Sequence, residues 1–311
     1  MKWNRGSLIG VALACLFLLG IFFGLTRKGQ GPPGGILSGS RAAQTLHKAE
    51  RLVSEGKKEE AGLLLQQFLT DTPVSPYSDE ALLLVGDLQR ENGKLLEAKA
   101  SYRKLVESFP DSNSALAAQE KLGQINLEIL FSPVMTERDK TYTVQPGDSL
   151  AKIASRNGIT VDLLMRANRL TTSIIQPGKK LKVPGGRFNL LVDKSQNTLT
   201  LKSDEEVLKV YAVATGEPSK SPTPVGTFKV TSKLVNPVWY TVGAVVAPES
   251  PQNILGTRWI GISLAGYGIH GTRDPSSIGK SVTAGCVRMN NGDVEELYGI
   301  VPIGIDVTII D

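Results

Sequence analysis

The stretch GIHGT at residues 268–272, followed by SVTAGCVRM at residues 281–289, decides how the C-terminal part of the chain is interpreted. The sequence has only two histidines and two cysteines, and His270 and Cys286 both lie here, each beside a glycine. A cysteine nucleophile needs a base that takes its proton and donors for the oxyanion that forms on an attacked carbonyl. The pair is therefore a candidate for catalysis, although a lone buried cysteine or histidine is more often structural.

Neighbouring residues can supply the other parts of such a site. Gly285 permits an unusual backbone conformation, so the amides of Gly285 and Cys286 can point at one oxygen. Arg288 alternates with Cys286 and can favour the thiolate or bind a substrate carboxylate. His47, the other histidine, is predicted to be only a polar position on the first helix.

Short apolar or alternating segments surround this pair and are separated by polar turns at hairpin spacing. They predict strands at residues 188–192, 198–202, 207–213, 226–231, 259–263 and 305–310, and one helix at 291–298. Residues 188–311 are therefore expected to form a mainly β domain, a sandwich or barrel of short strands.

The motifs YGIHGT and SIGKSVTAGCVRM, with TGEPSKSPTPVGTF at residues 215–228 and NPVWY at 236–240, resemble the L,D-transpeptidase catalytic domain of the YkuD family. The resemblance covers residues 188–311. It implies that Cys286 is the nucleophile and His270 the general base.

The same resemblance assigns three further roles. It implies that the amides of Gly285 and Cys286 form the oxyanion hole, that the Gly271 carbonyl fixes the imidazole tautomer, and that Arg288 orients the substrate. Many members carry histidine immediately before the Gly-Cys pair, where this chain has Ala284. This departure bears on fine positioning and substrate choice more than on activity.

The implied reaction is acyl transfer on peptidoglycan. Cys286 attacks the amide between the diamino acid at position three of a tetrapeptide stem and the terminal D-Ala, D-Ala leaves, and an amine resolves the thioester. Water in place of the amine would make the enzyme a carboxypeptidase. Two other interpretations stay open: a lapsed enzyme that persists as a glycan-binding scaffold, and a thiol peptidase of another family. No metal or organic cofactor is needed, because thiol, base and oxyanion donors suffice.

Residues 140–185 predict a second unit, with the order strand, helix, helix, strand. The motifs YTVQPGDSL, ANRL and IQPGKKLKVP resemble a LysM domain, which implies binding of glycans that contain N-acetylglucosamine, such as peptidoglycan. The resemblance places the glycan groove between two loops. These loops hold Gly147, Asp148, Ser149 and Leu150, and Ile175, Gln176, Pro177 and Gly178. Asp148 or Ser149 can also cap the first helix.

Residues 41–132 are predicted to be helical and contain an internal repeat. Gly56 and Gly93 lie 37 positions apart, as do Pro73 and Pro110, and the pattern of helix, glycine turn, helix and proline stop resembles tetratricopeptide repeats. A final helix is expected at residues 115–130. This region is interpreted either as a surface for a partner protein or as a rigid helical spacer.

Residues 8–25 are an unbroken apolar run flanked by basic residues, which is nearly long enough to cross a hydrocarbon core. Residues 1–28 are interpreted as a transmembrane anchor, with a cleaved signal peptide or a lipidated Cys15 as alternatives. Residues 29–40, rich in glycine and proline, are expected to be a flexible linker.

Charge and composition limit the remaining classes of partner. The net charge is +5, and its largest excess, +6, lies in residues 136–187, which favours anionic wall polymers. No nucleic-acid module is visible, and two cysteines with two histidines cannot form a zinc cluster of the usual ligand count. The sequence as a whole predicts a multidomain, membrane-anchored protein of the bacterial cell envelope, with most of the chain on the extracytoplasmic side.

Overall fold

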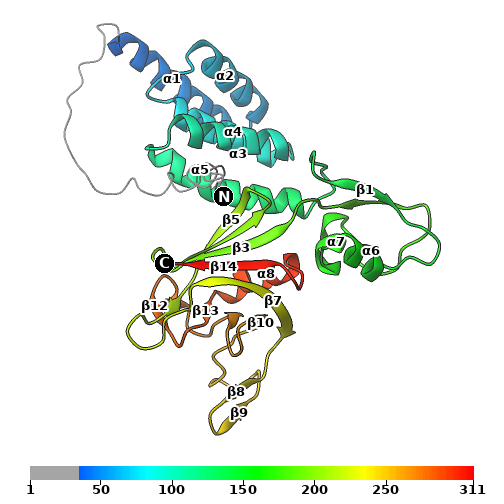
Figure 1. Ribbon diagram of the computed structural model, residues 1–311. Helices are drawn as coiled ribbons and strands as arrows, with labels where there is room; N and C mark the ends of the chain where they lie inside the picture. Colours follow the sequence, from blue (N-terminus) through cyan, green and yellow to red (C-terminus); the bar gives the residue numbers. More distant parts are fainter. Residues whose placement is uncertain (1–34) are drawn as a thin grey trace, which may run out of the picture.

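The computed structural model describes residues 35–311 (Figure 1), and it begins with five helices. These are α1 (Gly35–Ser54), α2 (Lys58–Asp71), α3 (Ser78–Glu91), α4 (Leu95–Ser108) and α5 (Asn113–Leu130). Buried apolar side chains hold α1, α2 and α3 in one cluster, and parts of α3, α4 and α5 in a second. The helical N-terminal region predicted from the sequence is present.

The two repeat glycines end two helices in the same way. Gly56 has φ +79° and Gly93 has φ +71°, a left-handed conformation that glycine adopts without steric cost. The residue after each glycine donates its amide to a carbonyl five positions back, from Lys57 to Leu52 and from Lys94 to Gln89, both at 2.8 Å. This is the hydrogen bond that closes a Schellman-type helix end.

A small unit follows, with β1 (Lys140–Thr143), α6 (Leu150–Arg156), α7 (Val161–Ala167) and β2 (Lys180–Val183). The two strands pair antiparallel, so the predicted order of strand, helix, helix, strand is confirmed. Ser149 caps α6 by accepting the Lys152 amide, and Thr160 caps α7 by accepting the Leu163 amide.

The C-terminal region is built on one eight-stranded mixed sheet, in the order β13-β11-β10-β7-β14-β3-β4-β5. The strands are β3 (Phe188–Asp193), β4 (Thr198–Ser203), β5 (Glu206–Ala212), β7 (Gly226–Val235), β10 (Arg258–Ile262), β11 (Gly268–His270), β13 (Val287–Arg288) and β14 (Asp306–Ile310). Helix α8 (Asn291–Ile300) packs against this sheet. The mainly β architecture is as expected.

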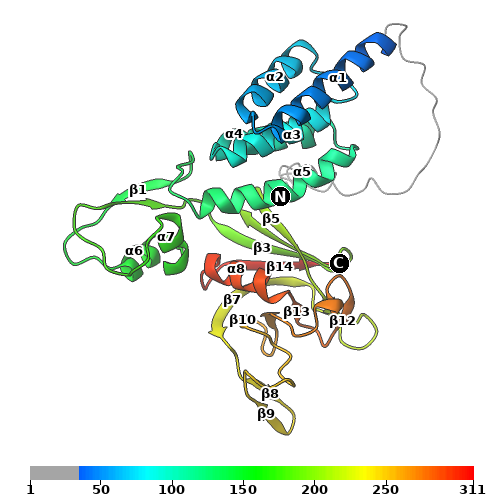
Figure 2. The same ribbon diagram turned by 180° about the vertical axis from the view of Figure 1, so that it is seen from behind.

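Two further pairs of short strands extend from the sheet. Strands β6 (Thr215–Gly216) and β12 (Ser281–Thr283) run parallel, and β8 (Trp239–Thr241) and β9 (Ala244–Val246) form a hairpin. Figures 1 and 2 both show this hairpin projecting from the end of the molecule opposite the helices. Strand β7 also continues beyond the predicted end at residue 231, because its pairing with β10 runs on to Val235.

The sheet curves so that β13, at one edge, contacts the residues that follow β5, at the other edge. Ala214, just after β5, forms an antiparallel bridge with Arg288 on β13, with both amide-to-carbonyl distances at 2.8 Å. The architecture is therefore an almost closed barrel. A continuous apolar cluster joins buried residues of the sheet, of α8 and of the βααβ unit.

The described residues also bear on the predictions for the N-terminal segment. The predicted anchor at residues 1–28 lies outside the described part of the chain. Among residues 35–311, no helix combines the length and the apolar character that a membrane crossing requires. Helix α1 begins at Gly35, so the linker prediction is wrong for residues 35–40. The stretch rich in glycine and proline ends there, and the next proline is Pro73.

Candidate active site

Two short parallel strands carry the predicted catalytic residues. Strand β11 ends at His270, β13 begins directly after Cys286, and the register places His270 opposite Arg288. Cys286 directly precedes β13, so His270 and Cys286 lie on two neighbouring segments of the chain. Ile269 and Val287 alternate to the opposite face and are buried in the core.

The imidazole of His270 is held from two sides. His270 is 3% exposed, and its Nδ1 donates a hydrogen bond to the Gly271 carbonyl at 2.7 Å. Because a carbonyl only accepts, Nδ1 carries the proton and Nε2 keeps a free lone pair in the neutral ring. Trp259 on β10 lies opposite His270 and stacks on it, with ring centroids 6.1 Å apart.

Burial sets the charge state of both groups. It lowers the pKa of His270 from 6.5 to about 4, an effect that the positive charge of Arg288 increases and the hydrogen bond to Gly271 partly opposes. Burial also raises the pKa of the Cys286 thiol, while a backbone hydrogen bond at Gly268 and the charge of Arg288 offset part of that rise. At neutral pH the two groups are therefore a neutral imidazole and a neutral thiol.

The turn before the cysteine has an unusual conformation. Gly285 has φ +111°, and a Cβ there would come within 2.7 Å of the Tyr267 ring, so only glycine fits. The Gly285 amide donates to the hydroxyl of Thr283 at 3.2 Å, and the same hydroxyl donates to the Cys286 carbonyl at 2.6 Å. Within the described residues the Cys286 amide has no hydrogen-bond partner, so it is the freer of the two predicted oxyanion donors.

The Cys286 thiol has one weak hydrogen-bond partner, whereas one nitrogen of the nearby Arg288 guanidinium has none among residues 35–311. Cys286 is partly exposed, and its Sγ lies 3.6 Å from the Gly266 carbonyl. Arg288 Nε is buried and has no hydrogen-bond partner among residues 35–311. Ala284, which directly precedes the Gly-Cys pair, is exposed.

Asn291 fixes the loop that follows the histidine. Its Oδ1 accepts the amides of Thr272 at 3.0 Å and Thr257 at 3.2 Å, and its Nδ2 donates to the Thr272 carbonyl at 2.8 Å. Gly271 and Gly256 lie so close that a Cβ on either would come within 2.3 Å of the Asn291 Oδ1. The first residue of α8 therefore positions the carbonyl that holds His270.

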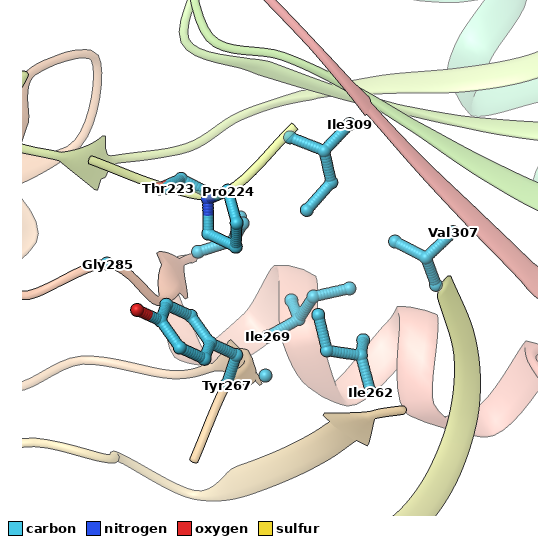
Figure 3. Close-up of a pocket in the computed structure, with 10 residues that line it drawn as sticks. Thr223, Pro224, Ile262, Tyr267, Ile269, Gly285, Val307 and Ile309 are labelled. Carbon is cyan, nitrogen blue, oxygen red and sulfur yellow. The ribbon is translucent and has the colours of Figure 1, made fainter. Parts of the chain in front are cut away.

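A small apolar cavity of about 10 Å³ lies beside the turn that contains Gly285 (Figure 3). Its lining includes Tyr267 and Gly285, with Ile262, Ile269, Val307 and Ile309 from the sheet. Because Ile269 and Val287 line it, the cavity is on the core side of β11 and β13, away from His270. It is a packing gap and not a substrate cleft.

The predicted glycan-binding loops are brought together at one end of the βααβ unit. The Gly178 amide donates to the Val144 carbonyl at 2.8 Å, and the Val144 amide donates to the Lys179 carbonyl at 2.9 Å. Gly147 and Gly178 have φ +82° and +86°, respectively. Both glycines are exposed, as are Ser149, Gln176 and Pro177, and Ile175 is half-buried.

Two residues of these loops point inward. The carboxylate of Asp148 accepts the Tyr142 hydroxyl at 2.6 Å and the Gln145 amide at 2.8 Å, which lowers the pKa of Asp148. Leu150 is 2% exposed and packs in the core. Asp148 therefore shapes its loop, and Leu150 offers a ligand its backbone alone.

Comparison with known proteins gives matches to the same three units. A model described as the L,D-transpeptidase catalytic domain matches residues 187–310, a LysM domain model matches residues 142–184, and a tetratricopeptide repeat model matches residues 80–112. The putative L,D-transpeptidase YkuD of Bacillus subtilis is 35% identical over 175 residues, which cover 54% of this chain and 98% of that protein. This chain belongs to the L,D-transpeptidase family.

Other similar proteins carry the same family name. The putative L,D-transpeptidase YqjB of Bacillus subtilis is 40% identical to this L,D-transpeptidase over 144 residues, or 45% of this chain and 80% of that protein. A crystal structure of an L,D-transpeptidase from Mycobacterium tuberculosis is 22% identical, with a TM-score of 0.36 over 44% of this chain and 64% of that one.

Four residues of this L,D-transpeptidase site were not singled out from the sequence. Trp259, Tyr267, Thr283 and Asn291 contact His270, Gly285, Cys286 and the loop after His270. Tyr267 and Thr283 lie inside the quoted motifs, so their proximity to the pair was a usable signal. Trp259 and Asn291 come from other strands and helices, and only the pairing of β10 with β11 and the start of α8 bring them close.

Proposed function

We propose that this protein is a peptidoglycan L,D-transpeptidase in which Cys286 is the nucleophile and His270 the general base. The observation that carries the proposal is the protonation pattern of the buried imidazole. Its Nδ1 proton is donated to the Gly271 carbonyl, so Nε2 is the acceptor of the neutral ring, on a strand that pairs with the residues directly after Cys286. A neutral base beside a neutral thiol can take the proton as the sulfur attacks.

The first half-reaction would be acylation of the enzyme. The thiol proton moves to His270 Nε2, Sγ bonds to the carbonyl carbon of the third stem residue, and the bond from that carbon to the D-Ala nitrogen breaks. The imidazolium returns the proton to the departing amine. The free Cys286 amide would donate to the oxyanion, and the Gly285 amide would join only by leaving the Thr283 hydroxyl.

The second half-reaction would release the enzyme. An acceptor amine attacks the thioester carbonyl, its proton passes to His270, and the sulfur leaves and is reprotonated. Arg288, whose buried Nε has no hydrogen-bond partner within residues 35–311, would orient an anionic group of the substrate. The low pKa of His270 favours rapid return of each proton, because the imidazolium is a stronger acid than usual.

The other units would place this chemistry on the cell wall. We propose that residues 140–185 bind the glycan strand through the loops at 147–150 and 175–178, and that residues 188–311 act on the peptide stem. Residues 1–28 would anchor the protein to the membrane, with the rest outside the cytoplasm. Residues 41–132 would hold the enzyme away from the membrane or receive a protein partner.

Mass spectrometry of products tests the activity. The full-length protein is incubated with disaccharide tetrapeptide, and we expect released D-Ala and cross-linked dimers, with Cys286→Ala as the blank. Tripeptide without dimer would indicate that water is the acceptor. No product of either kind would contradict the proposal.

A carbapenem distinguishes a working site from a lapsed one. We expect a covalent mass adduct on Cys286 in the wild type and none in Cys286→Ala. A wild-type protein that binds peptidoglycan yet forms no adduct and no product would be a glycan-binding scaffold.

A further inference from the structure

The βααβ unit at residues 140–185 is docked on its neighbours and is not merely joined to them by the chain. Helix α7 packs against α8 of the catalytic region, and the Thr160 hydroxyl donates to the Gly299 carbonyl. Arg166 on α7 places its guanidinium 3.3 Å from the centroid of the Phe131 ring, at the end of α5. One helix of the unit therefore contacts both other parts of the molecule.

Lys182 on β2 makes a second connection. Its ammonium donates to the carbonyls of Ile129, Ser132 and Val134 at 2.9, 2.9 and 2.5 Å, and lies 3.3 Å from Asp139. The side chain is 3% exposed. A buried cation with this many acceptors fixes the angle between β2 and the end of α5, because separating the two would leave the buried ammonium without its partners.

The apolar core runs through the contact. Leu127 of α5 joins Leu163 and Leu164 of α7 and Leu297 and Ile300 of α8 in one cluster. The connection from β2 to β3 is only residues 184–187, too short for free rotation about a packed face. The docked unit and the catalytic sheet therefore behave as one body.

Helix α8 links this contact to the active site. Its first residue, Asn291, holds the loop after His270, and its ninth, Gly299, receives α7. Ten helical residues span about 15 Å. The helix thus sets a fixed separation between the docked unit and the catalytic base.

We infer that the docked βααβ unit is a positioning element for polymeric substrate: it holds a glycan strand at a fixed distance and orientation from Cys286, so that stems carried by that strand enter the site. The inference rests on the proposed function. A flexible tether would only raise the local concentration of stems, whereas a fixed dock also removes their orientational freedom. The predicted glycan loops stay exposed in the docked state.

The test separates docking from tethering with a double variant, Gly299→Gln/Arg166→Ala. A Cβ at 299 would come within 2.3 Å of the Asp162 carboxylate on α7, so a glutamine there must push that side chain away, and the alanine removes the contact with Phe131. The matched control is Gly62→Gln/Arg169→Ala, because Gly62 lies in α2 with open space around it and Arg169 is exposed. Faster hydrogen exchange at residues 182–188 verifies undocking.

Both proteins are assayed on soluble disaccharide tetrapeptide and on insoluble peptidoglycan, and their binding to the insoluble polymer is measured by sedimentation. For the double variant we expect soluble turnover and polymer binding within about twofold of the control, and a rate on polymer at least about tenfold lower. Arg166→Ala alone keeps the fold and should give a smaller loss of the same kind.

Other outcomes overturn the inference. A polymer rate within twofold of the control would show that a tether suffices. An equal fall on both substrates would mean that the dock supports the catalytic loop and not the placing of polymer. Failure of the proposed function is a different result, because the wild type would then turn over neither substrate.

Discussion

His270 and Lys182 are both basic side chains in the interior, but they differ in how many of their nitrogen-bound protons and lone pairs have hydrogen-bond partners. Lys182 meets three carbonyls and Asp139, so its protons are all used. His270 makes one hydrogen bond, through Nδ1, and its Nε2 is left for chemistry. Burial lowers the pKa of both, yet only the histidine keeps a lone pair that can receive a proton. The contrast teaches that a buried base with an unpaired nitrogen is available for the proposed proton transfer, whereas a fully hydrogen-bonded one is structural.

Removing the base should have the largest effect. His270→Gln is expected to slow acylation of Cys286 by about 10²–10⁴-fold, because general-base assistance contributes about that much. The rate of carbapenem adduct formation measures it. His47→Gln is the matched control, since His47 is exposed on α1 and pairs only with Glu50. Equal rates of adduct formation for the two variants would show that His270 is not the general base.

Removing the structural cation should affect stability instead. Lys182→Met removes the charge that pairs with Asp139 and one donor that three carbonyls share, so the free energy of unfolding should fall by about 3–5 kcal/mol. Denaturant titration measures it, with Lys180→Met, an exposed neighbour on the same strand, as the control. Adding Asp139→Asn should recover part of the loss. Turnover of the soluble tetrapeptide by the folded fraction should stay unchanged. A large fall would contradict a purely structural role for Lys182.

Acid should reveal the buried neutral imidazole. In the folded chain the pKa of His270 is about 4, below its ordinary value of 6.5. As pH falls through this window the unfolded chain takes up the proton first, so the free energy of unfolding should fall by about 3 kcal/mol between pH 6.5 and 4. Denaturant titrations at both pH values should show a smaller loss for His270→Gln than for the wild type. Identical losses would mean that the imidazole is charged or exposed.

The smallest effect is expected at the turn that carries the sulfur. Thr283→Val removes the hydroxyl that accepts the Gly285 amide and donates to the Cys286 carbonyl, and acylation should slow about threefold to tenfold, the equivalent of one hydrogen bond. Thr283→Ser keeps the hydroxyl and should restore most of the rate. If valine and serine behave alike, the hydroxyl does not position the nucleophile.

The sequence was most informative where local pattern and structure coincide. The repeat glycines Gly56 and Gly93 were predicted to lie in turns between helices, and both do, with positive φ. The order of elements in residues 140–185 and the long strands of the C-terminal region followed from alternation and turn residues. Gly285 also has the positive φ that its position before Cys286 suggested.

What the sequence did not reveal depends on contacts between distant segments. Strands β11 and β13 have three and two residues, too few for a periodic signal, and they pair across a loop. The stacking of Trp259, the three hydrogen bonds of Asn291 and the docking of α7 on α8 exist only in the folded chain. The inward turn of Asp148 is similar, because a capping or ligand role and an internal hydrogen bond require the same residue type.

The bridge between Ala214 and Arg288 affects whether an extended peptide can pair with the edge of the sheet. An open sheet edge has unpaired amides and carbonyls that can pair with a strand of another chain, which promotes aggregation. Here β13 has β11 on one side and Ala214 on the other. At the opposite margin, the Asn126 side chain of α5 donates to the carbonyls of Val207 and Leu208 on β5. Both margins of the eight-stranded sheet are therefore occupied, so an extended peptide cannot lengthen this sheet without displacing one of these contacts.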